Sequence, residues 1–411
     1  MFSKRQQPYR MGAYSHLGEM CPDSSGKRYN LSFLRDFFVY MLNSYLFTSE
    51  SVCAGHPDKI CDRISDAILD AALTQDTHSR TGIETVAGAN QISLFGEIKT
   101  KASIDYEEIV RRAVKELGYT VPAWGFSQES TFTNNVHQQS PEIALGVDQD
   151  GAGDQGMMFG YACTDTPELM PMPILIAHAL TKKIDEVRKT KKLPWLRPDG
   201  KAQVTVRYEK GKCHSIEKLV AAVAHDESVS HEEVRVGIIK KVFKPVLSKY
   251  NMELPADKNI VVNGTGLWYI PGPESDAGLT GRKIVVDTYG GYARVGGGAF
   301  SGKDPSKVDR SGAYAARFIA KNIVAAGLAA KCEVGLAYVI GQPKPLMQTI
   351  DTFGTETVSE KALHAFKDKL IDTSVKGIIT TLNLAVPIYQ RTSAYGHFGR
   401  EEFPWEKIVS V

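Results

Sequence analysis

The sequence predicts an α+β fold made of three similar modules, each laying its helices on one face of a mixed sheet. The main observation behind this prediction is that the order helix–strand–strand–helix occurs three times along the chain. The second observation is size, because 411 residues with 43% hydrophobic content can form the cores of two or three domains. We expect three domains, at 46–143, 156–271 and 272–411.

The first module begins with a helix at His56-Pro57-Asp58-Lys59, since proline fits a first helical position and apolar residues then recur at helical spacing. Two strands are expected at 82–87 and 91–98, where apolar and polar residues alternate. A second helix is expected over 105–117, with its apolar residues on one face.

The second and third modules repeat this order. The second has a helix over 173–189, strands near 202–208 and 214–223, and a helix from the capping-box spacing Ser230–Glu233 to about 248. The third has a helix over 311–326 that Gly327 ends, strands near 332–340 and 346–353, and a helix over 359–371. Two further short strands are expected at 260–262 and 284–287.

Two segments fall outside the modules. Residues 1–45 are basic and then irregularly apolar, and we expect an extension that is disordered or precedes a natural start at Met41; a transit peptide is the alternative, although three acidic residues oppose it. Residues 125–156 are rich in Gln, Asn, Ser and Gly, which indicates a mobile lid or site-forming loop, with a plain linker as the alternative.

Composition excludes several classes of protein. A net charge of +2 without a long basic run gives no sign of nucleic-acid or membrane-surface binding. The sequence contains no run of 18 apolar residues, so no transmembrane helix is expected. Six scattered cysteines without a CxxC pair are typical of reduced thiols, so we expect a cytoplasmic protein.

The stretch 296–310, GGGAFSGKDPSKVDR, predicts a polyphosphate site. Its glycines let the backbone approach a ligand, Lys303 and Lys307 supply positive charge, and aspartates among them suit a divalent cation. The stretch follows the P-loop pattern for seven positions, but Asp304 replaces the hydroxyl residue at the eighth. A P-loop-like kinase or NTPase and a solvated glycine-rich loop are the alternatives.

Four other clusters suit phosphate or metal. Asp58 and His56 flank a helix N-terminus, where Asp58 is a candidate Mg²⁺ ligand and a helix cap is the alternative. GAGDQG (151–156) offers Asp154 to ribose hydroxyls, PDGK (198–201) presents Lys201 in a turn, and GLTGRK (278–283) brings Arg282 and Lys283 together. No Ser-His-Asp, Cys-His or metalloprotease pattern accompanies them.

Together, GHPDK, GAGDQG, WLRPDGK, GLTGRK, DTYGG, GGGAFSGKDPSKVDR and AYGHFGREEFPWEK resemble the S-adenosylmethionine synthetase (methionine adenosyltransferase) family, in order over roughly 46–407. The resemblance implies three similar α+β domains in a pseudo-threefold arrangement. It implies that methionine sulfur displaces triphosphate from C5′ of ATP and that the tripolyphosphate is then hydrolysed, with Mg²⁺ and K⁺ as cofactors. It also implies a homodimer with shared sites, often a dimer of dimers. A non-catalytic regulatory paralogue is the alternative, but it predicts missing charged residues and none is missing.

The resemblance also implies residue roles. The catalytic residues would be His56, near the breaking C5′–O bond, and the phosphate-binding Lys201, Arg282, Lys283, Lys303 and Lys307, with Asp309 in the same charged cluster. Asp58 would bind Mg²⁺ and Glu84 would bind K⁺. Methionine would contact Glu97, Gln139, Asp276 and Lys307; ATP would further contact Asp154, Asp199, Leu267, Trp268, Asp276 and Ala299. A thioether has no proton to lose, so no base is needed, and charges should stabilise the leaving triphosphate.

The chain departs from the family pattern at two places. Gly264-Thr265-Gly266-Leu267-Trp268 stands where the family has a Pro-[Ser/Thr]-Gly-Arg-Phe run, and Ala222-Val223-Ala224-His225 replaces Ser-x-Gln-His. These departures concern adenine binding and subunit packing, whereas every phosphate-handling position matches.

Overall fold

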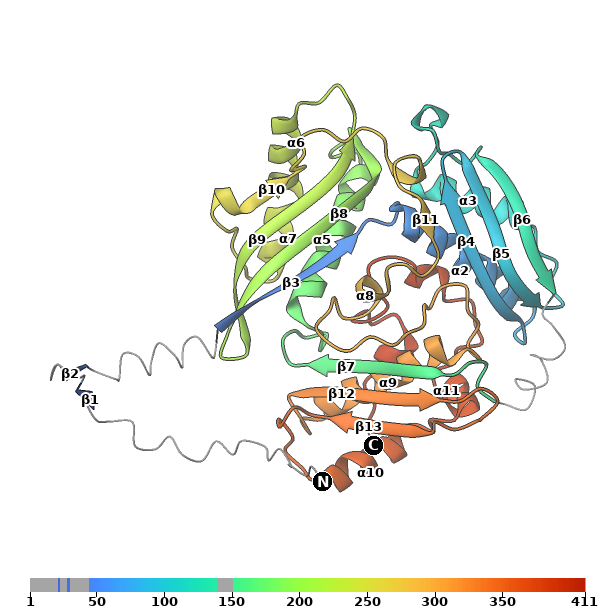
Figure 1. Ribbon diagram of the computed structural model, residues 1–411, viewed down its shortest axis with the longest axis vertical. Coiled ribbons are helices and arrows are strands. Elements are labelled where there is room, and N and C mark those ends of the chain that lie inside the picture. The colour runs from blue at the N-terminus through green and yellow to red at the C-terminus, as the bar shows by residue number, and fades with distance from the viewer. Residues whose placement is uncertain (1–20, 23–27, 30–43, 139–150, 411) are drawn as a thin grey trace, which may run out of the picture.

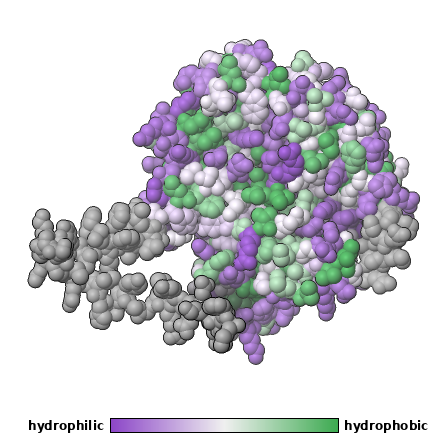
Figure 2. Space-filling view, viewed as in Figure 1, coloured by the Kyte–Doolittle hydropathy of each residue, from purple (hydrophilic) through white to green (hydrophobic). Residues whose placement is uncertain are grey.

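The computed structural model describes residues 21–22, 28–29, 44–138 and 151–410. Three sheets, each with helices on one face, surround the segment around the short helix α8 (Ile284–Asp287) (Figure 1). The fold is α+β, as the sequence predicts. On the face seen in Figure 2, hydrophobic residues lie in separate patches among hydrophilic ones. No helix in the described ranges combines the length and apolarity needed to cross a bilayer.

The first sheet has the strand order β11-β4-β5-β6. β4 (Arg80–Gly88) and β5 (Gln91–Lys99) are antiparallel, β6 (Thr131–Gln138) is parallel to β5, and β11 (Gly278–Leu279) pairs with β4. The helices α2 (Pro57–Gln75) and α3 (Tyr106–Leu117) cover one face, followed by the turn η1 (Pro122–Trp124). Their isoleucines and valines pack with Ile83 and Leu94 into one core.

The second sheet has the order β10-β9-β8-β3. Its strands are β3 (Ser44–Val52), β8 (Leu196–Glu209), β9 (Lys212–His225) and β10 (Ile260–Val262), which η3 (Asp257–Asn259) precedes. α5 (Met172–Lys189) packs on it, together with α6 (His231–Ile238), the π-helical turn η2 (Ile239–Phe243) and α7 (Lys244–Lys249).

The third sheet has the order β13-β12-β7. Its strands are β7 (Gly156–Cys163), β12 (Lys331–Tyr338) and β13 (Met347–Asp351). The helices of this unit are α9 (Val308–Ala325), α10 (Glu360–Leu370) and α11 (Val375–Thr381). Short elements complete the described chain: β1 (Cys21–Pro22), β2 (Arg28–Tyr29), η4 (Gly272–Glu274), η5 (Gln390–Thr392) and η6 (Pro404–Glu406).

Each sheet contains a strand from a distant part of the sequence. β3 precedes the first module yet pairs with β8 over nine residues, β7 precedes the second module yet pairs with β12, and β11 from the third module pairs with β4. These exchanged strands tie the units together, so the loops that lead into them run between the sheets. The expected domain boundaries remain a prediction.

The structure confirms the three rounds of helix, strand, strand and helix, including the capping box at Ser230 and Glu233. The expected strand at 284–287 is wrong, because these residues form α8, in which the Asp287 amide donates to the Lys283 carbonyl at 2.8 Å. The segment 125–156 is not structureless either, since it contains β6. Residues 139–150 of that segment lie outside the described residues, and its role as lid or linker stays a prediction.

Candidate active site

The N-terminus of α2 is the centre of the site. His56 is the N-cap residue, and its Nδ1 accepts the Asp58 amide at 3.2 Å. The side chain is buried. Burial, followed by the positive charges of Lys283 and Lys201, lowers the pKa of His56 to about 3. The imidazole is therefore neutral near pH 7, and Lys201 and Lys283 are its nearby cations.

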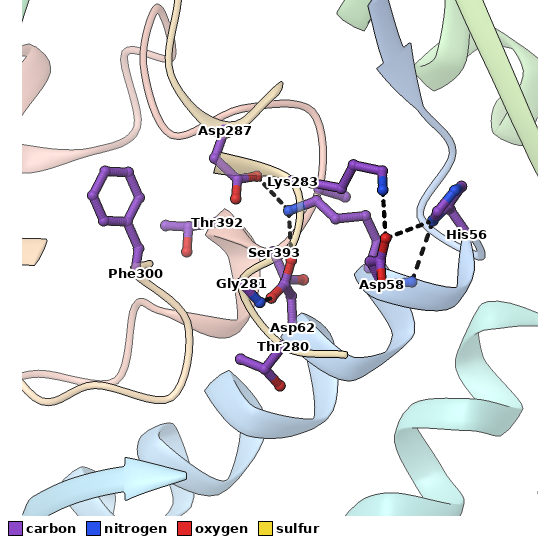
Figure 3. A network of polar contacts seen from close by, with 12 residues as sticks. His56, Asp58, Asp62, Thr280, Gly281, Lys283, Asp287, Phe300, Thr392 and Ser393 are labelled. Carbon is purple, nitrogen blue, oxygen red and sulfur yellow. Dashed lines mark hydrogen bonds and ion pairs between the residues drawn. The ribbon is translucent and has the colours of Figure 1, made fainter. Parts of the chain in front are cut away.

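Asp58 brings two of the predicted phosphate-binding residues to this helix end. Lys283 Nζ donates to Asp58 Oδ2 (Figure 3). Arg282 Nη1 lies 3.8 Å from Asp58 Oδ1, which also accepts the Leu279 amide at 3.0 Å. Burial would raise the pKa of Asp58, but the bonds from Lys283 and the Leu279 amide outweigh it and hold that pKa below its usual value. Asp58 is thus a carboxylate in a cationic environment.

The GLTGRK segment lies against the glycine-rich loop. Gly281 has a φ of +79°, and a Cβ atom there would collide with Ala299. Gly302 also has a φ of +79° and packs against the Ile83 carbonyl of β4. Only glycine allows both the left-handed backbone and these close approaches. The glycines therefore let two cationic loops and a sheet edge meet beside α2.

The lysines of the glycine-rich loop point to its own aspartates and to β4 and β5. Lys303 Nζ lies 2.5 Å from Asp309 Oδ2. Lys307 Nζ donates to the Thr81 carbonyl at 2.6 Å, and Asp304 and Glu97 lie 3.4 and 3.9 Å from it. The structure thus brings Lys303, Lys307, Asp309 and the predicted methionine contact Glu97 into one cluster.

Arg310 and Asp304 support the loop from behind. Arg310 is fully buried, pairs bidentately with Asp66 at 2.7 and 2.9 Å, and donates to the Phe300 and Lys303 carbonyls at 3.0 and 3.3 Å. Asp304 is buried and accepts the Thr81 amide at 2.9 Å. Neither side chain is therefore accessible to a bound phosphate.

Two further motifs reach the same place. The Gly153 amide of GAGDQG donates to the Ser306 carbonyl at 3.1 Å, which sets this motif against the glycine-rich loop. The Cys53 amide donates to the Gly200 carbonyl at 2.8 Å, which sets PDGK beside GHPDK. Lys201, the last residue of PDGK, is exposed. GHPDK, PDGK and GLTGRK therefore meet at the start of α2, whereas the glycine-rich loop, with GAGDQG against it, is bonded farther along the helix at Asp66.

Asp199 and Asp154 have local partners. Asp199 is buried, and its Oδ2 accepts the Gly272 amide at 2.9 Å. Burial, the largest cause, raises the pKa of Asp199 to about 7, although the Gly272 amide and Lys201 lower it. Asp154 is half-buried and accepts the Gln155 amide at 2.8 Å. Asp199 thus anchors the turn η4, which leads to Asp276.

The remaining predicted residues lie farther out. Glu84 is exposed on β4, two residues along from Gly82, which faces Glu97 on β5. Asp276 is exposed beside Ala277, whose carbonyl accepts from Arg282 at 3.3 Å. Leu267 is exposed, and Trp268 is half-buried with its indole N–H on the Ile270 carbonyl at 2.8 Å. Gln139 lies outside the described residues.

Three supporting residues were missed by sequence reasoning. Lys59 is buried and contacts Asp62 and Asp287, and the Asp62 carboxylate accepts the Gly281 amide at 2.8 Å (Figure 3). A signal was present, because aspartates recur every four residues in α2, at 58, 62, 66 and 70, and so share one helix face.

The donor set suits a hard divalent cation that takes most ligands from its substrate. Mg²⁺ is commonly bound by one or two carboxylates plus phosphates and waters, and Asp58 supplies an ionised carboxylate among phosphate-suited cations. Within the described ranges, no group of three or more acidic, histidine or cysteine side chains could hold a metal alone. Lys283 would have to release one Asp58 oxygen for such an ion.

Cationic loops held along α2, with a neutral histidine and an ionised carboxylate at its N-terminus, are typical of an enzyme that acts on a polyphosphate. Three family models match successive parts of the chain: S-adenosylmethionine synthetase N-terminal domain over residues 44–141, central domain over 149–268 and C-terminal domain over 270–407. The chain belongs to the S-adenosylmethionine synthetase family. Members of this family require a divalent metal ion.

Two curated relatives agree with this placement. The S-adenosylmethionine synthase of Sulfurovum sp. is 50% identical over 378 residues, which cover 90% of this chain and 98% of the relative. The S-adenosylmethionine synthase of Treponema denticola is 52% identical over 371 residues, covering 88% and 95%. The similarity thus extends over nearly the whole of both relatives.

Proposed function

We propose that this protein forms S-adenosyl-L-methionine from ATP and L-methionine, and then hydrolyses the tripolyphosphate to pyrophosphate and phosphate. The observation that carries the proposal is the placement of cations along α2: Lys201, Arg282 and Lys283 lie beside its N-terminus, and Lys303 and Lys307 lie in the loop that Asp66 holds farther along the helix. The methionine sulfur attacks C5′ of ATP, the C5′–O bond breaks, and its electron pair leaves with the triphosphate. The product is a sulfonium ion, and no proton is removed from the nucleophile.

The cations stabilise the charge that develops on the leaving triphosphate. Arg282 and Lys283 contact Asp58 in the free protein, and Lys303 contacts Asp309, so their charges are already held in place before substrate binds. His56 is neutral and can donate one N–H to the C5′ oxygen. A divalent ion held by Asp58 would neutralise part of the phosphate charge.

Methionine would bind at the other end of the cluster. Glu97 and Asp276 supply carboxylates for its amino group, and Lys307, 3.9 Å from Glu97, supplies a positive charge for its carboxylate. Leu267, Trp268 and Ala299 would border the adenine, and Asp154 and Asp199 the ribose side. Mg²⁺ at Asp58 and K⁺ at Glu84 are the cofactors we propose.

We also propose a cytoplasmic homodimer that shares its active sites, with a dimer of dimers as the larger assembly. Glu84 lies on a sheet face that also exposes Val86 and Phe95, at 37% and 44%, which supports a second copy covering this face. Light scattering should give at least twice the monomer mass; a monomer that is fully active would exclude shared sites.

The P-loop kinase alternative is not favoured. In that class the residue after the loop lysine holds the metal with a hydroxyl, whereas here Asp304 is buried and bonded to the Thr81 amide. A kinase would also require a separate acceptor, whereas methionine attack on C5′ does not transfer phosphate.

The two chemical steps can be tested separately. Arg282→Ala and Lys201→Ala should each lower sulfonium formation by on the order of 10²-fold or more, because each removes a preorganised charge. The wild type should hydrolyse added tripolyphosphate even without methionine. Full activity in both variants, or a wild type that is inert toward tripolyphosphate, would contradict the proposal.

A further inference from the structure

Lys59 is the buried lysine of the GHPDK motif, and the proposed chemistry does not use it. Its ammonium donates to Asp62 Oδ2 at 2.8 Å and to Asp287 Oδ1, and its side chain is completely buried. It therefore cannot touch a phosphate. A lysine with two buried carboxylates at its tip is instead a fixed link between α2 and α8.

The segment that Lys59 links to α2 is the one that carries Arg282 and Lys283. At its start, the Leu279 and Gly281 amides donate to Asp58 at 3.0 Å and Asp62 at 2.8 Å. At its end, Asp287 contacts Lys59. The segment is thus attached to two turns of α2 at three points, and both cations lie between the attachments.

The glycine-rich loop is attached to the same helix independently. The Gly302 amide donates to Asp66 Oδ1 at 2.9 Å, and Asp66 holds Arg310, which binds the Phe300 and Lys303 carbonyls. One face of α2 therefore carries two separate supports, one for each cationic loop.

We infer that Lys59, with Asp62 and Asp287, is a positioning group that sets where Arg282 and Lys283 meet the triphosphate of the nucleotide. The inference rests on the proposed function. Removing Lys59 frees the end of the segment, and a displacement of about 1 Å at a positioning group can cost on the order of 10²-fold in rate. The loss should appear only in interactions that Arg282 and Lys283 make.

A double-mutant cycle tests this coupling by binding, without requiring turnover. The ligand is the imido analogue of tripolyphosphate, whose bridging NH groups resist hydrolysis, with Mg²⁺ present and calorimetry as the measurement. Lys59→Met and Lys283→Ala should each weaken binding by about tenfold or more. Added to Lys283→Ala, Lys59→Met should weaken binding by less than about threefold, because only Arg282 remains of the two cations that it positions.

Lys303→Ala provides the matched cycle. Lys303 lies in the loop that Asp66 and Arg310 hold, so Lys59→Met should weaken binding in that background by the same factor as in the wild type, within about twofold. If Lys59→Met weakens binding by the same factor in the Lys283→Ala and Lys303→Ala backgrounds, the inference is overturned, even if the wild type forms S-adenosylmethionine normally. Failure of the wild type to form that product would overturn only the proposed function.

Two variants separate positioning from general loss of stability. Lys321→Met also removes a buried lysine, whose partner Glu406 keeps its pair with Arg317, so it should lower the melting temperature while binding stays within about twofold. Asp287→Asn leaves the Lys59–Asp62 pair intact and serves if Lys59→Met does not fold. It should show the same non-additivity with Lys283→Ala; weakened binding that adds fully to Lys283→Ala would contradict a positioning role.

Discussion

Arg310→Met should be among the most destabilising single substitutions near the site. The guanidinium is fully buried and donates to both Asp66 oxygens, to Thr392 Oγ1 at 2.9 Å and to the Tyr314 hydroxyl at 2.9 Å. Methionine keeps much of the volume but leaves the Asp66 charge buried without its partner. Removing one member of a buried ion pair costs about 3–5 kcal/mol.

Arg112→Met is the matched control. Arg112 also makes two bonds to one carboxylate, that of Glu108, at 2.7 and 2.8 Å, but both side chains are more than half exposed. Such exposed pairs contribute about 0–1 kcal/mol. The two pairs differ chiefly in burial, although Arg112 makes both of its bonds from Nη1 whereas Arg310 uses Nη1 and Nη2.

Thermal unfolding followed by circular dichroism measures the difference. For an unfolding unit of 150–250 residues, 1 kcal/mol shifts Tm by about 2–4 °C, so Arg310→Met should lower Tm by roughly 6–20 °C and Arg112→Met by a few degrees at most. The double variant Asp66→Leu with Arg310→Met should recover part of the loss, since no unpaired charge remains. Equal melting temperatures for the two single variants would refute the reasoning.

Three other predictions concern metal, adenine and pH. Asp58→Asn should lower activity and raise the Mg²⁺ concentration needed for half-maximal rate; an unchanged Mg²⁺ titration would remove Asp58 from the metal site. Trp268→Ala should raise the ATP KM by on the order of tenfold, because stacking on a base is worth roughly 1–3 kcal/mol, while Trp268→Phe should be tolerated; a folded Trp268→Ala protein with the wild-type KM would contradict stacking. Burial, then Arg400 and Lys59, lowers the pKa of His178 to about 3, so the unfolded state binds the extra proton between pH 3 and 6.5 and stability falls as pH drops through that window. Between pH 6.5 and 5 the free energy of unfolding should fall by about 2 kcal/mol for this reason. Urea unfolding of His178→Gln should therefore depend less on pH than that of the wild type, and identical pH profiles would exclude this role of His178.

Periodicity was sufficient for the regular elements of the fold. The apolar face of α2 and the capping box of α6 are encoded within a few residues, so local sequence predicts them. β6 escaped detection because TFTNNVHQ is polar and largely exposed along both faces, and it forms a strand only by pairing with β5. The β-branched run at Ile284 predicts a strand, but these residues form the helical turn α8. Asp287, at the end of that turn, contacts the buried Lys59, which is distant in sequence.

The candidate site, like the fold, was predictable where the signal is local and not where it depends on long-range pairing. The motifs identified the cations, because glycines and lysines at short spacing are a local signal. Their convergence depends on exchanged strands such as β11, and pairings across more than 190 residues have no local signal. Arg310 shows the limit most clearly, since it is three residues from Lys307 in sequence, and only the fold shows that it is buried and supports the loop of Lys303.

The most direct test is product analysis by mass spectrometry and phosphate assay after incubation of the purified protein with ATP, methionine, Mg²⁺ and K⁺. The proposed function predicts one S-adenosylmethionine, one pyrophosphate and one phosphate for each ATP consumed, and none of the three when methionine is replaced by norleucine, which lacks the sulfur. ADP as a product, or ATP consumption that norleucine supports equally well, would contradict it.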